Sequence, residues 1–371
     1  MLSHLDETLR HQVAATFCEV GPSDHRFFDR LWFCAYHPEG DVALITGMGC
    51  YTNMNVLDGF AAVSHRGRQH NLRLSRCLRP RIDDLAVGPL RVEVLEPLRA
   101  LRLVLDGDAP GGTAFDLHWE GALPPTEEAH HLDVLDGRRV SDYRRFDQVG
   151  AVRGTLRVEG ETFDAAGWFG ARDHSWGVRR GVGGFEPFTG SLPPEAAGYL
   201  FLWLAFTTDE VGGQLQLHED GEGRRRMLDG ALTRLDRPGE PVRVVDVAHE
   251  LDFVPGTRAY RHARLRIDTE DGGSHVLEAE PLVTAWAYLG TGYDGGFDDG
   301  RGLGAFRGDL VVEHDVYDVS HPEDVGLPDG RVVRPVHREQ PVRLTFDGRP
   351  GLGHLPVINV GRIRRYGLGE G

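Results

Sequence analysis

The sequence contains no lysine, so the 41 basic residues among its 371 are all arginines. Without an ε-amine the chain cannot form a Schiff base, anchor pyridoxal phosphate or supply the lysine of a phosphate loop. The 57 acidic residues outnumber the arginines and give a net charge of −16. This excess of negative charge argues against a nucleic-acid backbone or an anionic membrane surface as partner.

Cysteine is scarce, and no apolar run is long enough to cross a membrane. Residues 1–7 lack the basic region and the apolar core of a signal peptide, so we expect a cytoplasmic protein with no membrane span. The cysteines form no CxxC pair, and we expect buried thiols rather than disulfides or zinc ligands. They are Cys18, Cys34, Cys50 and Cys77.

The motifs of metal, nucleotide and hydrolase chemistry are also missing. The 18 histidines form no HxH or HExxH pattern, and there is no GxSxG elbow or phosphate loop. His130 and His131 beside Asp133 resemble a metal corner, but a loop after Pro124-Pro125 explains them more simply. We therefore expect neither a metal nor a cofactor.

Long helical patterns are absent. Apolar residues at helical spacing occur only near the N-terminus, at Leu5, Leu9, Val13 and Phe17, and predict one short helix. Beyond them, apolar and polar residues alternate with the period of two that is typical of strands. The clearest runs are Leu90–Leu95, Leu101–Leu105, Thr113–Trp119, Thr155–Val158, Arg243–Val247, Arg264–Asp268, Leu310–Glu313 and Val342–Phe346.

Short turn signals separate these runs, in a chain with 49 glycines and 21 prolines. Such turns favour antiparallel hairpins over βαβ units, and the sequence therefore predicts an all-β protein. The turn dipeptides are Asp106-Gly107, Asp136-Gly137, Glu159-Gly160, Asp229-Gly230, Asp271-Gly272, Asp329-Gly330 and Asp347-Gly348.

The length of the chain exceeds what one hydrophobic core usually serves, which predicts two domains. A Gly/Pro-rich stretch from Gly181 to Pro194 interrupts the strand pattern, and we place the boundary there, giving domains of residues 1–185 and 186–371. The apolar run Tyr199–Phe206 follows it. This run is typical of a strand buried on both sides, with a ligand contact by Trp203 as the alternative.

The segment from Gly167 to Arg179 is the strongest candidate for chemistry. If it is a strand, Trp168, Gly170, Arg172, His174 and Trp176 share one face, while Asp173 points to the other. In a barrel, the first face would line an aromatic interior with a cationic, titratable centre. His174 could donate a proton there near neutral pH, and an indole face could stabilise a cation.

Asp173 has two interpretations. As a functional residue it would orient His174 or supply the acid, although adjacent strand residues cannot both enter one cavity without a bulge. As a structural residue it would be a buried carboxylate bonded to backbone amides, to Arg172 or to Arg179. The geometry of this strand decides between the two.

Two stretches, Asp142–Gly150 and Trp168–Arg179 with its Arg172–Gly177 core, resemble the AttH-like and carotenoid-hydratase (hydroxyneurosporene synthase) group, in particular members of unknown function. The resemblance implies two lipocalin-like antiparallel β-barrels packed together, a calycin-like architecture, and a hydrophobic substrate within or between them. It also implies that Asp173, His174 and Trp176 serve acid-catalysed addition of water to an isoprenoid double bond.

Two functions fit these observations. The first is an enzyme without a cofactor, a hydratase/lyase or cyclase/isomerase of an isoprenoid, steroid or lipid-like molecule, in which Asp173 or His174 protonates a double bond or an epoxide. The second is a non-catalytic carrier that holds a hydrophobic ligand unchanged. The expected ligand contacts are Trp168, Arg172, Trp176, Trp203, Trp286 and Tyr288.

Overall fold

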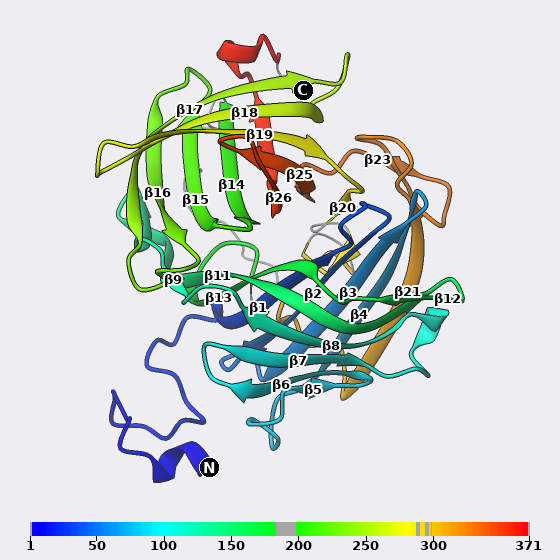
Figure 1. The fold of residues 1–371 in the computed structure, drawn as a ribbon. Helices are drawn as coiled ribbons and strands as arrows, with labels where there is room; N and C mark the ends of the chain where they lie inside the picture. The colour runs from blue at the N-terminus through cyan, green and yellow to red at the C-terminus, as the bar shows by residue number, and fades with distance from the viewer. Residues whose placement is uncertain (1, 183–197, 287–289, 294–296, 298, 370–371) are drawn as a thin grey trace.

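The computed structural model describes residues 2–182, 198–286, 290–293, 297 and 299–369. Their strands form one large curved antiparallel sheet and one closed antiparallel barrel beside it (Figure 1). The all-β prediction is confirmed, and every run expected to be a strand lies wholly or largely in one. The described helical segments are three short 3-10 turns, η1 (His4–Glu7), η2 (Pro110–Gly112) and η3 (Arg364–Tyr366).

The large sheet contains 16 strands, in the order β23-β22-β21-β4-β3-β2-β1-β13-β11-β8-β7-β6-β5, with β9, β10 and β12 also paired to β11. Strands β21 to β23 come from the second half of the chain and extend the sheet beyond β4. The bounds are β1 Phe27–Tyr36, β2 Val42–Tyr51, β3 Val56–His65, β4 Arg68–Cys77, β5 Ala86–Val87, β6 Leu90–Glu96, β7 Ala100–Leu105, β8 Ala114–Gly121, β9 Thr126–Glu127, β10 His131–Leu135, β11 Arg138–Val158, β12 Glu161–Asp164, β13 Trp168–Val178, β21 Leu310–Asp318, β22 Val325–Gly326 and β23 Val332–Val333.

The barrel closes because β14 pairs with both β15 and β26, so that eight strands form a ring in the order β14-β15-β16-β17-β18-β19-β25-β26. Strand β27 adds to β14, and β20 (Ala285–Trp286) pairs separately with β24 (Arg338–Glu339). The barrel strands are β14 Gly198–Thr208, β15 Val211–Asp220, β16 Arg225–Arg234, β17 Val242–Phe253, β18 Tyr260–Thr269, β19 Ser274–Pro281, β25 Pro341–Phe346, β26 Arg349–His354 and β27 Val357–Gly361.

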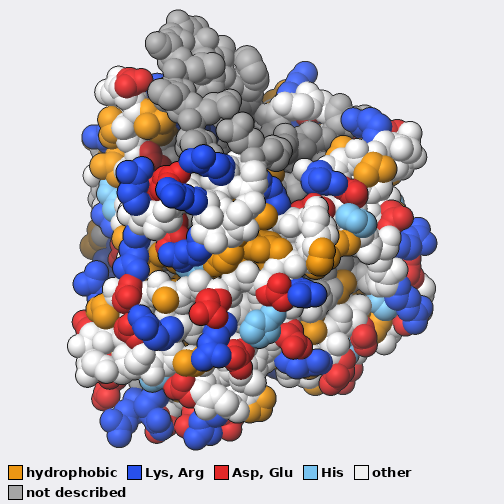
Figure 2. Space-filling model, turned by 90° about the horizontal axis from the view of Figure 1, so that it is seen from above, with side chains coloured by type: hydrophobic (Ala, Val, Ile, Leu, Met, Phe, Trp, Pro, Cys, Tyr) orange, Lys and Arg blue, Asp and Glu red, His pale blue; other side chains and the backbone are white. Residues whose placement is uncertain are grey.

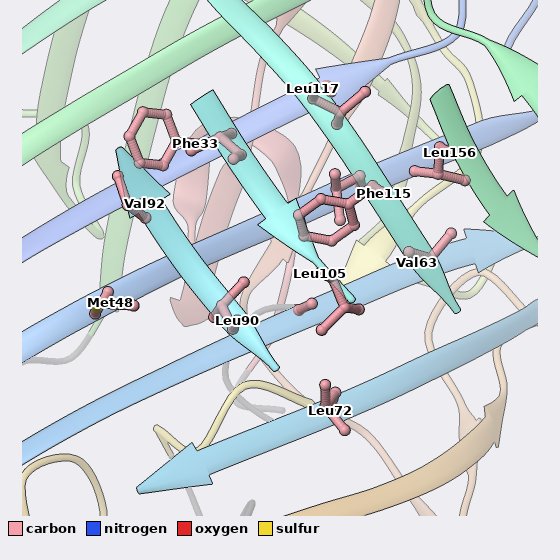
Figure 3. Close-up of a cluster of buried hydrophobic side chains, with 14 of the residues drawn as sticks. Phe33, Met48, Val63, Leu72, Leu90, Val92, Leu105, Phe115, Leu117 and Leu156 are labelled. Carbon is pink, nitrogen blue, oxygen red and sulfur yellow. The ribbon is translucent and has the colours of Figure 1, made fainter. Parts of the chain in front are cut away.

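Three main apolar clusters hold these layers together. The curved sheet encloses the first, in which side chains of β6 and β7 face those of β2 to β4 across the core (Figure 3). The barrel encloses the second, and the third lies between sheet and barrel around Trp32, Phe169 and Trp203. Each large apolar side chain buried in this way contributes about 1.5–3 kcal/mol. Because the third cluster joins sheet and barrel, the outer face of β1, β13 and β11 is also an interior surface.

A short N-terminal helix is present as η1, which Ser3 caps through a hydrogen bond from the backbone N–H of Leu5. It ends before the other apolar positions at helical spacing, and the Leu9 side chain is 98% exposed. Helices of this length depend on an apolar surface that covers one side. The segment instead leads away from both the sheet and the barrel (Figure 1).

One turn prediction was wrong, because Asp229-Gly230 lies inside β16. A Cβ at Gly230 would lie 2.4 Å from the Gln214 carbonyl oxygen, so this glycine permits a close approach of β15 and β16 rather than a turn. The proposed domain boundary at 185/186 lies outside the described residues and stays a prediction.

Viewed from above, arginine and acidic side chains intermingle around a strip of hydrophobic side chains on the surface of the molecule (Figure 2).

Candidate active site between sheet and barrel

Strand β13 presents its two faces to different interiors. Trp168 belongs to the core inside the curved sheet, whereas Phe169 and Ala171 belong to the cluster against the barrel. The alternation predicted for this strand therefore holds, and it separates Arg172 from Asp173.

Arg172 lies on the inner face and is buried. Its Nε and Nη2 donate hydrogen bonds of 2.9 and 2.7 Å to Oε1 of Gln148, and its guanidinium lies 5.0 Å from the rings of both Trp119 and Phe146. Burial lowers the pKa of Arg172 to about 10, with a small opposing effect from Asp173. These contacts give Arg172 a role in packing; its predicted ligand contact stays a prediction.

His174 lies further along the same inner face, where the strand extends beyond the core. Its Nε2 is 2.7 Å from Oδ1 of Asp29, and its ring contacts Phe146 and Trp176 at centroid distances of 5.3 and 5.4 Å. The His174 side chain is 30% exposed and Trp176 is 37% exposed. Because Asp173 points to the opposite face, the two predicted catalytic residues do not form a dyad.

Asp173 enters the space between sheet and barrel and meets a group that the sequence analysis did not identify. Its Oδ2 lies 3.8 Å from Nη1 of Arg145, in place of the contacts expected to Arg172 or Arg179. Asp147 is directly opposite Asp173 in the β11–β13 ladder. Burial raises the pKa of Asp173, and the charge of Arg145 opposes this rise.

Arg145 and Glu128 form the charged centre of this group. Oε2 of Glu128 accepts a hydrogen bond of 2.7 Å from Nε of Arg145 and lies 2.6 Å from Nε2 of His131, and Gln216 of β15 donates to Oε1. Burial by itself would raise the pKa of Glu128, but Arg145, Asp147 and His131 outweigh burial and hold it far below its usual range. Glu128 is therefore a carboxylate.

Asp147 has the opposite protonation state. It is 2% exposed, and burial, the adjacent Glu128 carboxylate and a hydrogen bond to it raise the pKa of Asp147 well above its ordinary value. Two neighbouring carboxyls in one buried site cannot both ionise readily, so one of them keeps its proton. Because Arg145 binds Glu128 directly but lies 4.0 Å from Asp147, the proton resides on Asp147.

A pocket of about 200 Å³ opens beside this neutral carboxyl. Asp147 lines this pocket, and its Oδ1 is buried without a hydrogen-bond partner among the described residues, so one oxygen of the acid has an unused bonding position. A carboxylic acid kept neutral near physiological pH can act as a general acid. The lining residues are Thr126, Glu128, Asp147, Gln214, Leu215, Gln216, Asp229, Gly230, Ala231, Pro241 and Arg243.

The other expected ligand contacts lie apart from one another. Trp168 is 1% exposed inside the first core, and Trp286 is fully buried, with its backbone N–H bonded to Gln69. Trp203 packs against Trp32 near the carboxyl cluster, with the Arg145 guanidinium 5.8 Å from its ring. Tyr288 lies outside the described residues. Of the predicted set, Asp173 and Trp203 are thus closest to the new cluster.

The protonation of Asp147 predicts how stability depends on pH. A raised pKa in the folded state means that stability is fully present below the ordinary carboxyl pKa and is lost as the pH rises towards the folded-state pKa. We expect Asp147→Asn, which imitates the neutral acid, to match the wild type near pH 4. As the pH rises above 4, the free energy of unfolding of Asp147→Asn should exceed that of the wild type by a growing amount, up to about 1.4 kcal/mol for each pH unit.

Urea unfolding at several pH values measures this difference. Asp142→Asn is the matched control, because hydrogen bonds from His130 and Arg139 lower the pKa of Asp142 on the same strand. That variant should gain no stability at alkaline pH. A constant difference between Asp147→Asn and wild type from pH 4 to pH 9 would contradict a neutral Asp147.

The curved antiparallel sheet packed against an eight-stranded barrel is a lipocalin-like fold of the kind found in a putative AttH. The crystal structure of a "putative AttH" from Nitrosomonas europaea matches with a TM-score of 0.53 at 12% identity, over 90% of this chain and 92% of that one. Kievitone hydratase from Nectria haematococca aligns with a TM-score of 0.45 at 12% identity, over 90% of this chain and 88% of that one. The structure of CghA with Sch210972 aligns with a TM-score of 0.45 at 10% identity, over 91% of this chain and 89% of that one.

The chain belongs to the family described as "Family of unknown function (DUF8625)", which it matches over residues 2–369. No curated protein matches the sequence. The predicted AttH-like fold and the predicted relation to members of unknown function are thus confirmed. In the described part of the chain, no helix is long and apolar enough to cross a membrane. The four cysteines are free thiols, of which Cys18 and Cys34 are buried.

Proposed function

We propose that this protein is an enzyme that protonates an unsaturated, lipid-like small molecule in the pocket between sheet and barrel, with Asp147 as the acid. The observation that supports this most directly is a buried, neutral carboxyl with one unbonded oxygen at the pocket wall. Ligand pockets commonly combine apolar walls with a few convergent polar groups. Leu215, Ala231 and Pro241 supply the apolar part here.

The proposed step conserves atoms and charge. Asp147 transfers its proton to one carbon of a double bond, which leaves a cation on the other carbon and a carboxylate on Asp147. The nearby carboxyls of Glu128 and Asp173 stabilise positive charge in this water-poor space. Water then adds to the cation and returns a proton to Asp147, so that the net reaction is hydration. Capture by an internal nucleophile gives cyclisation, and loss of a neighbouring proton gives isomerisation.

A second candidate is a carrier that holds a hydrophobic ligand without changing it. The indole N–H groups of Trp32 and Trp203 are buried near the cluster and have no hydrogen-bond partners among the described residues, which suits an aromatic contact surface as well as a reaction site. In a carrier the Glu128–Asp147 pair would serve only to position the neighbouring strands.

Mass spectrometry of the purified protein separates the two functions. We expect a co-purified lipid-like molecule that, after incubation of the complex in D2O, carries non-exchangeable deuterium on carbon. Protonation of a double bond from a solvent-exchanged acid requires this label. A ligand recovered unchanged and unlabelled after prolonged incubation would support the carrier and contradict the enzyme.

A further inference from the structure

Arg30 of β1 is a buried cation that forms no ion pair with the described residues. Arg30 is 2% exposed, and its Nη1 donates a hydrogen bond of 3.2 Å to the Tyr51 hydroxyl. Nε and Nη2 are both buried and have no hydrogen-bond partner in the part of the chain that the structure describes. Among the described residues, no carboxylate oxygen lies within 4 Å of this guanidinium. Burial lowers the pKa of Arg30, but Tyr293, Tyr51 and the more distant Asp58 and Asp173 outweigh burial and raise it. An unpaired buried charge costs several kcal/mol, so a native arginine in this state needs an explanation.

The two unbonded nitrogens lie on the same edge of the guanidinium. Other arginines of this protein present that edge to a carboxylate: Nε and Nη2 of Arg102 donate to the two oxygens of Asp116 at 2.8 and 2.7 Å. Arg234 binds Asp236 in the same way, and Arg307 binds Asp299. Such paired bonds are strong and specific for a planar two-oxygen group. The edge of Arg30 lacks that group.

Aromatic rings hold the Arg30 guanidinium in place. It lies 4.4 Å from the ring centre of Tyr293 and 5.2 Å from that of Phe60. Gly49 permits the contact with Tyr51, because a Cβ at this position would lie 2.5 Å from the Tyr51 hydroxyl oxygen. The side chain is thus fixed before any ligand arrives, which reduces the entropy lost on binding.

Strand pairing places Arg30 on the same face as the acid cluster. Arg30 pairs with Ser175, and Ser175 pairs with Arg145. Asp173 therefore lies one strand over and two residues along from Arg30, and Asp147 lies two strands over and two residues along, which is ~8 and ~12 Å between backbone positions. A single lipid-like molecule can span such distances.

We propose that the Nε–Nη2 edge of Arg30 binds a carboxylate of the substrate, so that the substrate class is a lipid-like carboxylic acid with a double bond. This inference rests on the proposed function for the double bond, but the carboxylate subsite has its own test. The carboxylate supplies the missing counter-ion and anchors the molecule, while its unsaturated part reaches the carboxyl cluster.

Isothermal titration calorimetry with two probes of equal size tests the subsite. We expect wild-type protein to bind 1-naphthoate at least ten times more tightly than the uncharged 1-naphthalenemethanol. Arg30→Met should lose this preference while keeping its affinity for the alcohol. Arg30→Lys keeps the positive charge but not the two-donor edge, and it should lose most of the preference for naphthoate over the alcohol. Arg153→Met, at an exposed arginine of β11, should bind both probes as wild type does.

Thermal unfolding adds a readout that a structural arginine would not give. Naphthoate should raise the melting temperature of wild type but not of Arg30→Met. Equal affinity of wild type for the two probes, or a preference that persists in both variants at Arg30, would overturn the subsite.

The Asp147→Asn variant separates this inference from the proposed function. It should retain the preference for naphthoate, since it leaves Arg30 in place. Loss of the subsite with deuterium labelling intact would reject the carboxylic acid alone. A carboxylate preference without any labelling would reject the enzyme and retain an acid-binding carrier.

Discussion

Asp147→Asn is expected to lower turnover of the co-purified ligand by about 10²- to 10⁴-fold, the usual contribution of a positioned general acid. Asparagine keeps the shape of the neutral carboxyl and can still donate a hydrogen bond to Glu128, but it has no proton to transfer. Wild-type turnover should fall as the pH rises through the raised pKa of Asp147, because only the protonated form is active. Product formation under single-turnover conditions measures both effects.

Asp142→Asn provides the control for that experiment. Asp142 lies on the same strand, is partly exposed and bonds to His130 and Arg139, so its loss should leave turnover within about twofold of wild type. If Asp147→Asn retains full activity while Asp173→Asn or His174→Ala loses it, the acid is one of the residues predicted from the sequence.

Arg145→Met should reduce the free energy of unfolding by about 3–5 kcal/mol. Removal of this guanidinium leaves the Glu128 carboxylate buried without its cation, beside a second carboxyl and Asp173. Loss of one partner of a buried pair costs much more than the pair contributes, because the remaining charge stays desolvated. Urea unfolding followed by tryptophan fluorescence measures the change.

The adjacent arginine offers a matched control. Arg144 is exposed and has one ion pair of 3.4 Å, with the exposed Glu127. Arg144→Met should therefore change the free energy of unfolding by at most about 1 kcal/mol. The double variant Arg145→Met/Glu128→Gln should recover part of the lost stability, because it no longer carries the buried negative charge of Glu128. Equal losses for Arg144→Met and Arg145→Met would show that the cluster is not a buried ion pair.

The strands were predictable where alternation was clean. In β18 and β25, for example, one face packs into the barrel core, and the sequence shows the period of two. The pattern failed at Asp229-Gly230, because a glycine that permits close strand contact has the same sequence signature as a turn. It also could not show that Leu9, Val13 and Phe17, which follow η1, would remain exposed.

The candidate site was predictable only in part. The alternation of side chains along a strand was enough to place Asp173 and His174 on opposite faces, and the structure has them there. Asp147 belongs to one of the two segments that carried the family resemblance, yet its role was not visible. Both faces of β11 are covered, so polar residues such as Gln148 and Asp147 occur on either side of the strand and blur the pattern.

The sequence by itself determined the all-β class, the exclusion of lysine chemistry and the face to which each residue of β13 points. These depend on composition and on a local period of two. Only the tertiary structure decided that Glu128, Arg145, Asp147 and Asp173 meet against the barrel. It also decided that Arg30 lies on the same face with two nitrogens that no described residue binds. The physical reason is that ladder register and packing between sheets join residues far apart in the chain, and burial then sets the protonation of the groups that they bring together.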